Sequence, residues 1–305
     1  MALNVNVPAV RKAVLPYGLL LPALLALLFA LGYPLVRQVI LSFQEFGLAQ
    51  QFGAAPEWIG LQNYRELVSD EYLWVLVLRS VVFCLVNAGL TMVLGVAIAL
   101  LMRLMSTPVR LVVQAGLLIA WAMPVLASLT VFTWLFDTQY GVVNWVLDHL
   151  GADYAGHSWL IEPMSFFVVA TLLVVWMSIP FVAFTVYAAL TQVPQDILEA
   201  AEVDGAGPWQ RTKLVVFPSI RPVLLVVGLL EVVWGLRVFT QIYVLQQAGG
   251  VTRETNLLGT YVYRAGIGQG EFGVAATVAM FMLALTVLLT APYVITMMRD
   301  DEARA

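Results

Sequence analysis

The sequence predicts an all-α protein that crosses a membrane several times. Of its 305 residues, 61% are hydrophobic and 11% are charged, and the mean hydropathy is +0.90. Soluble domains carry about 45–50% apolar and about 25% charged residues, so a water-soluble fold with a polar shell is excluded. Uncharged stretches long enough to cross about 30 Å of hydrocarbon recur along the chain. They must be helical because lipid offers the backbone no hydrogen-bond partners, and the alternation typical of a β-barrel is absent.

Six spans are predicted from these stretches. Five lack Asp, Glu, Lys, Arg and His, and a further one is apolar except for Glu231 and Arg237. The first follows Arg11 and Lys12 but is too long for the apolar part of an ordinary signal peptide, so we expect an uncleaved helix. The predicted boundaries are about 13–36, 80–102, 111–136, 163–190, 222–247 and 272–298.

The distribution of Lys and Arg predicts the orientation of the spans. With the N-terminus in the cytoplasm, nine of these residues lie on the inside, five lie on the outside and Arg237 lies within a span. The loop 137–162 has no Lys or Arg and carries four acidic residues, which suits an outer loop. Both termini are therefore predicted to be cytoplasmic.

Composition also excludes several function classes. The two lysines, Lys12 and Lys213, do not follow a Gly, so the chain has no phosphate-binding loop of the G-x-x-x-x-G-K-[ST] type. A net charge of −4 gives no indication of nucleic-acid binding. The single cysteine, Cys84, rules out an internal disulfide framework.

The cytoplasmic segment 192–218 does not have the composition of a plain linker. Pro194 suits the start of a helix and Gly205 its end, and Pro208 can begin a second short helix. Ile197, Leu198 and Ala201 share a small apolar face for which the segment offers no cover. Two interpretations follow: a surface loop resting on the bilayer, or an element that docks into a groove of another subunit.

The same segment resembles the EAA loop of ABC-importer permeases. The resemblance rests on Glu199-Ala200-Ala201, Asp204-Gly205 and the ending Val215-x-Phe217-Pro218, where the family usually has Ile-x-Leu-Pro. In that family the loop forms a coupling helix that enters a cleft of the ATPase subunit. The residues that the resemblance assigns to ATPase coupling are Glu199, Ala200, Ala201, Asp204, Gly205 and Pro218.

Three further segments, 57–64, 135–144 and 241–250, look like the carbohydrate (maltose/trehalose-type) branch of these permeases. The resemblance implies a type I ABC importer permease fold in a prokaryotic plasma membrane. It also implies three kinds of partner: a second homologous permease, ATP-binding subunits and an extracytoplasmic sugar-binding protein. ATP and Mg would be bound by the ATPase, and this chain would hold no cofactor.

Span four carries the first candidate residues for a substrate path. Val174, Met177, Ser178 and Phe181 share one helical face, and Pro180 removes a backbone hydrogen bond beside them. A sugar path would use such a face, but so would a packed seam between helices, where Ser is common. Spacing alone leaves both interpretations open.

Span five contains two ionisable residues, and such a group costs about 2.5–3.5 kcal/mol at the centre of a span. Glu231, Trp234, Val238 and Gln241 cluster on one side of this helix, whereas Arg237 points elsewhere. Arg237 either reaches a partner on another helix or extends toward the membrane edge. The resemblance places sugar contacts in the middle of spans four and five, at Val174, Met177, Ser178, Phe181, Glu231, Trp234, Gly235 and Val238.

Other functions stay open with less support. An ion-coupled secondary transporter could use Glu231 as its proton site, whereas an intramembrane enzyme would need a catalytic constellation that the sequence lacks. His149 and His157 are eight residues apart, which is not the spacing of a zinc site. Asn87 is expected to hydrogen-bond a neighbouring helix.

Overall fold

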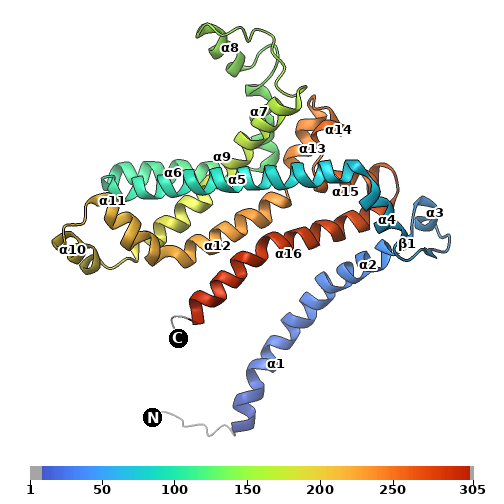
Figure 1. Ribbon diagram of the computed structural model, residues 1–305, viewed down its shortest axis with the longest axis horizontal. Coiled ribbons are helices and arrows are strands. Elements are labelled where there is room, and N and C mark those ends of the chain that lie inside the picture. The colour runs from blue at the N-terminus through green and yellow to red at the C-terminus, as the bar shows by residue number, and fades with distance from the viewer. Residues whose placement is uncertain (1–8, 303–305) are drawn as a thin grey trace, which may run out of the picture. The chain divides into compact units, whose positions relative to one another are not determined.

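The computed structural model describes residues 9–302, and the chain in it is almost entirely helical (Figure 1). Five helical segments are long and apolar enough to cross a membrane: Tyr17–Ser42, Glu71–Leu104, Pro163–Thr191, Pro208–Gln247 and Phe272–Arg299. A sixth span is present if the bent pair Thr107–Ala122 and Val125–Leu135 is counted as one. The chain forms two compact units, one containing residues up to Ser69 with Val262–Met280, the other containing Asp70–Tyr261 with residues from Phe281 onward.

The first unit begins with α1 (Ala9–Leu27), a π-helical turn (Leu28–Gly32) and α2 (Tyr33–Ser42). A short antiparallel pair, β1 (Gln44–Glu45) and β2 (Glu57–Trp58), encloses α3 (Leu48–Gln51) and precedes α4 (Gln62–Ser69). Buried Asn63 donates from Nδ2 to the carbonyls of Ser42 and Gln44, at 3.2 and 3.0 Å. Thr277, near the start of α16 (Phe272–Glu302), donates to the same Ser42 carbonyl and joins the two stretches of the unit.

The second unit is built on α5 (Glu71–Leu104), which packs mainly on α9 (Pro163–Thr191). Gly95 allows this approach, since a Cβ there would lie 2.6 Å from the Cβ of Val182. α12 (Phe217–Leu236) packs against both helices. The shorter elements are α6 (Thr107–Ala122), α7 (Val125–Leu135), α8 (Val142–His149), α10 (Gln195–Val203), α11 (Pro208–Arg211), a π-helical turn (Thr212–Val216), α13 (Thr240–Gln247), α14 (Thr252–Thr255), α15 (Leu258–Tyr263) and a last π-helical turn (Arg264–Gly268) that belongs to the first unit.

Three predicted spans differ from the observed helices. The predicted span 222–247 is α12, which begins at Phe217 and ends at Leu236, followed by α13, with residues 237–239 non-helical between them. α5 begins at Glu71, nine residues before the predicted start at position 80. The prediction began too late because it counted only uncharged residues and therefore excluded Arg79. The Arg79 guanidinium has a hydrogen-bond partner inside the protein, since its Nη1 donates to the carbonyl of Asn256 at 3.1 Å. The predicted span 111–136 is two helices whose axes are bent by 99°. Pro124 causes the break, because a proline disfavours helical geometry in the residue before it and Met123 is extended.

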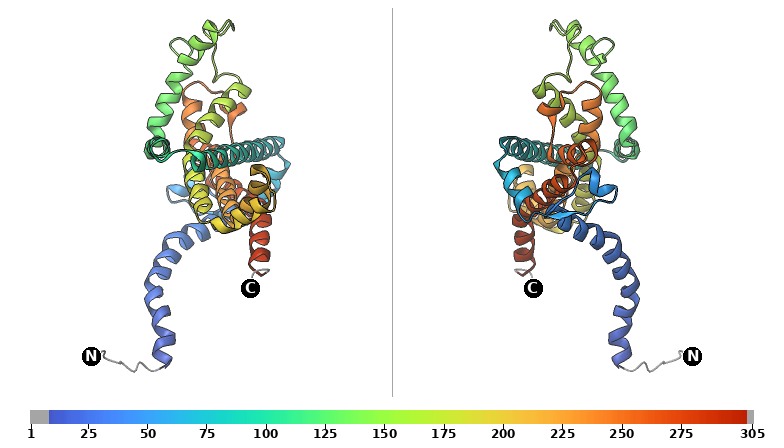
Figure 2. Two further views of the ribbon diagram at one scale, coloured as in Figure 1. Left: turned by 90° about the vertical axis from the view of Figure 1, so that its left-hand side faces the viewer. Right: turned by 90° about the vertical axis from the view of Figure 1, so that its right-hand side faces the viewer.

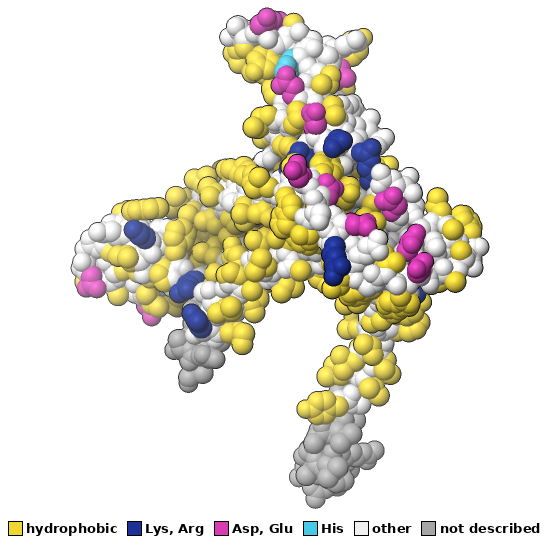
Figure 3. All heavy atoms as spheres, turned by 45° about the vertical axis from the view of Figure 1, so that its right-hand side comes forward, with side chains coloured by type: hydrophobic (Ala, Val, Ile, Leu, Met, Phe, Trp, Pro, Cys, Tyr) yellow, Lys and Arg dark blue, Asp and Glu magenta, His cyan; other side chains and the backbone are white. Residues whose placement is uncertain are grey.

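Figure 2 shows that α8 projects away from the other helices of the second unit. Figure 3 shows hydrophobic side chains covering the helices of this unit, with its charged side chains gathered toward α10 and α11 and toward the opposite end. This surface is what a helix bundle presents to lipid, because only its ends need to meet water.

Candidate functional site: a central cavity and a cytoplasmic elbow

A cavity of about 570 Å³ lies within the second unit, between α5, α9, α12, α13 and the α6–α7 break. All eight residues predicted for the substrate path line it: Val174, Met177, Ser178, Phe181, Glu231, Trp234, Gly235 and Val238. The structure thus brings the two predicted faces together, while contact with a substrate stays a prediction. The other lining residues are Asn87, Ala120, Trp121, Met123, Val125, Arg237 and Gln241.

The position of this central cavity follows from the packing along α9. Buried residues from Phe166 to Val174 belong to one hydrophobic core, and those from Val182 to Leu190 belong to another. Between these two cores α9 turns Met177, Ser178 and Phe181 toward the cavity. The helix continues through Pro180 without a break.

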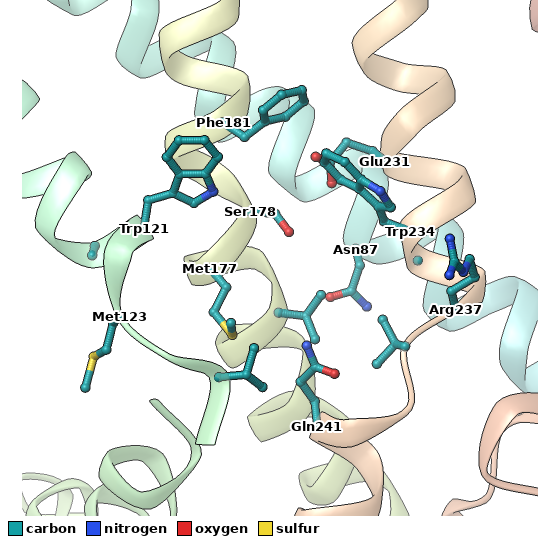
Figure 4. A pocket seen from close by; sticks show the side chains of 15 residues that line it. Asn87, Trp121, Met123, Met177, Ser178, Phe181, Glu231, Trp234, Arg237 and Gln241 are labelled. Carbon is teal, nitrogen blue, oxygen red and sulfur yellow. The ribbon is translucent and has the colours of Figure 1, made fainter. Parts of the chain in front are cut away.

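Two buried polar side chains in the lining have acceptor oxygens without a partner among the described residues. Glu231 is 4% exposed and its Oε1 accepts no hydrogen bond within the described residues. Asn87 is 2% exposed and its Oδ1 is also unpartnered, while its Nδ2 donates to the carbonyl of Phe83 at 2.7 Å. The expectation that Asn87 bonds a neighbouring helix is therefore wrong, because its amide bonds its own helix. Figure 4 shows Ser178, Asn87 and Gln241 pointing into the same space.

Aromatic rings form part of the same wall. Phe181 and Trp234 pack edge to face with centroids 4.9 Å apart, joining the α9 and α12 sides. Gly235 lets α12 approach α5 closely, since a Cβ there would lie 3.0 Å from Cys84 Sγ. Arg237 is exposed directly after α12, and its guanidinium forms no hydrogen bond or ion pair with any described residue, so the structure gives this side chain no partner on another helix.

Sequence reasoning missed Trp121 and Met123 because it treated 111–136 as one straight helix. Both residues reach the cavity only because the chain breaks before Pro124. The proline was the available signal, since the residue before it avoids helical geometry. Gln241 and Val238 line the cavity too, but not from one helix with Glu231 as predicted, because Val238 lies in the break after α12 and Gln241 lies on α13.

The segment from α10 to the following π-helical turn forms an elbow (residues 195–214). α10 begins one residue after Pro194 and ends at Val203, and α11 begins at Pro208 as predicted. Gly205 has φ +81°, and its N–H donates to the Glu202 carbonyl while that of Ala206 donates to Ala201. This pair of bonds is a Schellman cap, which requires the left-handed backbone that glycine adopts readily.

The apolar face of the elbow is only partly uncovered. Leu198 is 6% exposed because it packs with Val216 and Ile220, which corrects the expectation that the segment cannot bury this face. By contrast Val203 is 88% exposed and Ile197 is 46% exposed. Glu199 and Ala200 are exposed on α10 too, and Asp204 and Pro218 are exposed nearby. Ala201 is half-buried.

Comparison with known proteins identifies the family. Residues 91–297 match the family described as "Binding-protein-dependent transport system inner membrane component". The chain belongs to this family of transport permeases. It is also similar along most of its length to curated relatives, so the predicted resemblance to carbohydrate-type ABC-importer permeases is confirmed.

Two relatives show how far the similarity extends. The chain is 43% identical to the diacetylchitobiose uptake system permease protein of Streptomyces coelicolor, over 95% of this chain and 88% of the relative. It is 32% identical to the trehalose/maltose transport system permease protein of Thermococcus litoralis, over 93% of each chain. Both alignments therefore include the elbow and most of the cavity-lining helices.

A solved structure supports the fold. A chain of a bacterial ABC transporter involved in the import of the acidic polysaccharide alginate matches with a TM-score of 0.76 and 22% identity, over 95% of this chain and 97% of that one. The predicted all-α, type I ABC importer permease fold is thus confirmed.

Proposed function

We propose that this chain is one permease subunit of an ATP-driven importer for a disaccharide or short oligosaccharide. Family membership supports the transport role, and relatives named for diacetylchitobiose and for trehalose/maltose support the substrate class. The observation that carries the proposal is the central cavity. Its unpartnered Glu231 and Asn87 oxygens lack hydrogen-bond donors, and sugar hydroxyl groups supply donors.

The proposed complex has four kinds of component. A second homologous permease closes the path, an extracytoplasmic sugar-binding protein delivers the substrate, and ATPase subunits that bind ATP and Mg grip the elbow. This chain then needs no cofactor and is not an enzyme. Both of its termini lie in the cytoplasm, which places the elbow on the ATPase side of a prokaryotic plasma membrane. Closure of the ATPase pair pushes the elbow and opens the central cavity alternately to each side.

The direct test is reconstitution of the complete transporter in vesicles, with uptake of labelled maltose and N,N′-diacetylchitobiose as the measurement. We expect uptake that requires ATP and persists after proton and sodium gradients are collapsed. Uptake that follows an ion gradient without ATP would instead support the ion-coupled alternative at Glu231. The family assignment weighs against that alternative.

A further inference from the structure

A second pocket, of about 320 Å³, lies at the end of α7 away from the α6–α7 break. Ligand pockets in proteins span roughly 300–1,000 Å³, so this volume suits a small ligand group. Thr130, Thr133, Trp134 and Asp137 line one side, and Ser158 lines the other. The outer pocket, as we call it, shares no lining residue with the central cavity.

The α7 side of the outer pocket is one helical face. Thr130, Thr133, Trp134 and Asp137 follow the i, i+3, i+4, i+7 spacing, whereas Leu129 of the same helix is fully buried in the core. A helix face in the hydrocarbon core carries mainly aliphatic side chains and avoids carboxylates. This face carries two hydroxyls, an indole and a carboxylate, which is a set that can bind a polar ligand with a flat apolar side.

The Asp137 carboxylate is anchored at one oxygen and open at the other. Oδ1 accepts hydrogen bonds from the backbone N–H groups of Tyr140 and Gln139, at 2.8 and 2.9 Å. These two bonds lower the pKa of Asp137 below its ordinary value, so the group is ionised at neutral pH. Oδ2 accepts no hydrogen bond from any described residue and is left as a charged acceptor beside Trp134.

Buried Asn144 holds the two walls of the outer pocket together. Its Nδ2 donates to the His157 carbonyl at 2.8 Å, and its Oδ1 accepts from Trp159 Nε1 at 2.5 Å. These two bonds fix the loop segment that carries Ser158. The turn after Asp137 is equally tight, since a Cβ on Gly141 would lie 2.3 Å from the Asp137 carbonyl. The residue pattern from Leu135 to Asn144 therefore builds a rigid pocket wall.

We propose that the outer pocket is a carbohydrate subsite, in which a pyranose ring of the transported sugar stacks on Trp134 and donates a hydroxyl hydrogen bond to Asp137 Oδ2. The proposal rests on the sugar-import function and deepens it by adding a site that the sugar meets outside the central cavity. A neutral sugar suits the site better than an anion, because the free Asp137 oxygen would repel negative charge.

The test uses the complete transporter labelled with 5-fluorotryptophan, without the binding protein. The fluorine resonance of Trp134 is assigned by its loss in W134F, and that of Trp145, an exposed tryptophan on α8 outside the pocket, by its loss in W145F. Maltose and N,N′-diacetylchitobiose are titrated separately. We expect one of them to shift the Trp134 resonance saturably and to leave the Trp145 resonance unchanged.

The variant D137N sharpens the test. The Asn oxygen can still accept both backbone hydrogen bonds, so the turn is retained, but the free charged acceptor is lost. We expect the half-saturation concentration for the Trp134 shift to rise about tenfold, the size of a lost hydrogen bond to a charged group. An unchanged half-saturation concentration in D137N would overturn the assigned role of Asp137.

Uptake measured in parallel separates failure of the subsite from failure of the proposed function. If either sugar is transported while neither moves the Trp134 resonance, or if Trp134 and Trp145 shift alike, the subsite is wrong and sugar import stands. If neither sugar is transported and neither moves Trp134, both proposals fall.

Discussion

The central cavity and the elbow have opposite mismatches with their surroundings. In the cavity, polar oxygens of Glu231 and Asn87 are buried in an apolar helix bundle without partners. At the elbow, apolar Val203 and Ile197 stay exposed on a segment predicted to face the cytoplasm. Each arrangement costs free energy in the isolated chain. Binding of hydroxyl donors in the cavity, or of an apolar protein surface at the elbow, would remove that cost.

The largest expected effect on uptake comes from a substitution that disrupts only the elbow. Replacing Gly205 by Val strains the +81° backbone and places a branched side chain on the docking face. We expect uptake to fall about thirtyfold or more, because a docking contact of about 2 kcal/mol is lost, while sugar binding in the cavity is retained. Co-purification of the ATPase subunits measures the docking contact, vesicle uptake measures transport, and titration of the purified transporter with sugar measures binding.

A matched control for that variant is G151V, since Gly151 also has positive φ (+89°) and open surroundings but lies after α8. It carries similar backbone strain and should retain the ATPase subunits. V203E tests the same face without any backbone strain. If G205V and V203E both transport normally, the elbow is not the coupling element.

Replacing Glu231 by Leu should impair substrate binding in the central cavity and leave the elbow unchanged. We expect uptake to fall about tenfold, because a hydrogen-bond acceptor for the substrate is lost. We also expect the purified protein to unfold at a higher temperature, since an unsatisfied buried group costs about 1–3 kcal/mol. Thermal unfolding in detergent and vesicle uptake would show the two opposite changes. A variant that is less stable yet fully active would contradict the role given to Glu231.

Replacing Asn87 should also lower uptake, but by less than replacing Glu231. N87L removes a neutral acceptor and its bond to the Phe83 carbonyl, so a fall in uptake of about fivefold is expected. N87D keeps an acceptor oxygen and serves as the comparison in the same uptake assay. Equal loss in both variants would mean that the acceptor at position 87 does not contact the substrate.

The smallest effect is expected from the Arg211–Glu202 ion pair inside the elbow. Its side chains are 25% and 64% exposed, and pairs exposed to this degree contribute about 0.2–1 kcal/mol. A double-mutant cycle with R211Q and E202Q, measured as ATPase co-purification at low and high salt, should give a small coupling that salt weakens. A large, salt-insensitive coupling would show that this pair, and not the apolar face, holds the elbow in shape.

The sequence determined the elbow well because its structure depends on local chemistry. Pro208 begins a helix where predicted and Gly205 ends one, since both effects act through the backbone of one or two residues. The faces of α9 and α12 were also predictable, because helical periodicity fixes which residues share a side and all eight predicted path residues line one cavity.

Only the tertiary structure decided which residues complete and close these sites. Trp121 and Met123 reach the cavity through a 99° bend whose direction no local rule gives. Leu198 is covered by Val216 and Ile220, residues eighteen and more positions away. Periodicity assigns a side chain to a face of its own helix, but which atoms meet it there is settled by the packing of other helices.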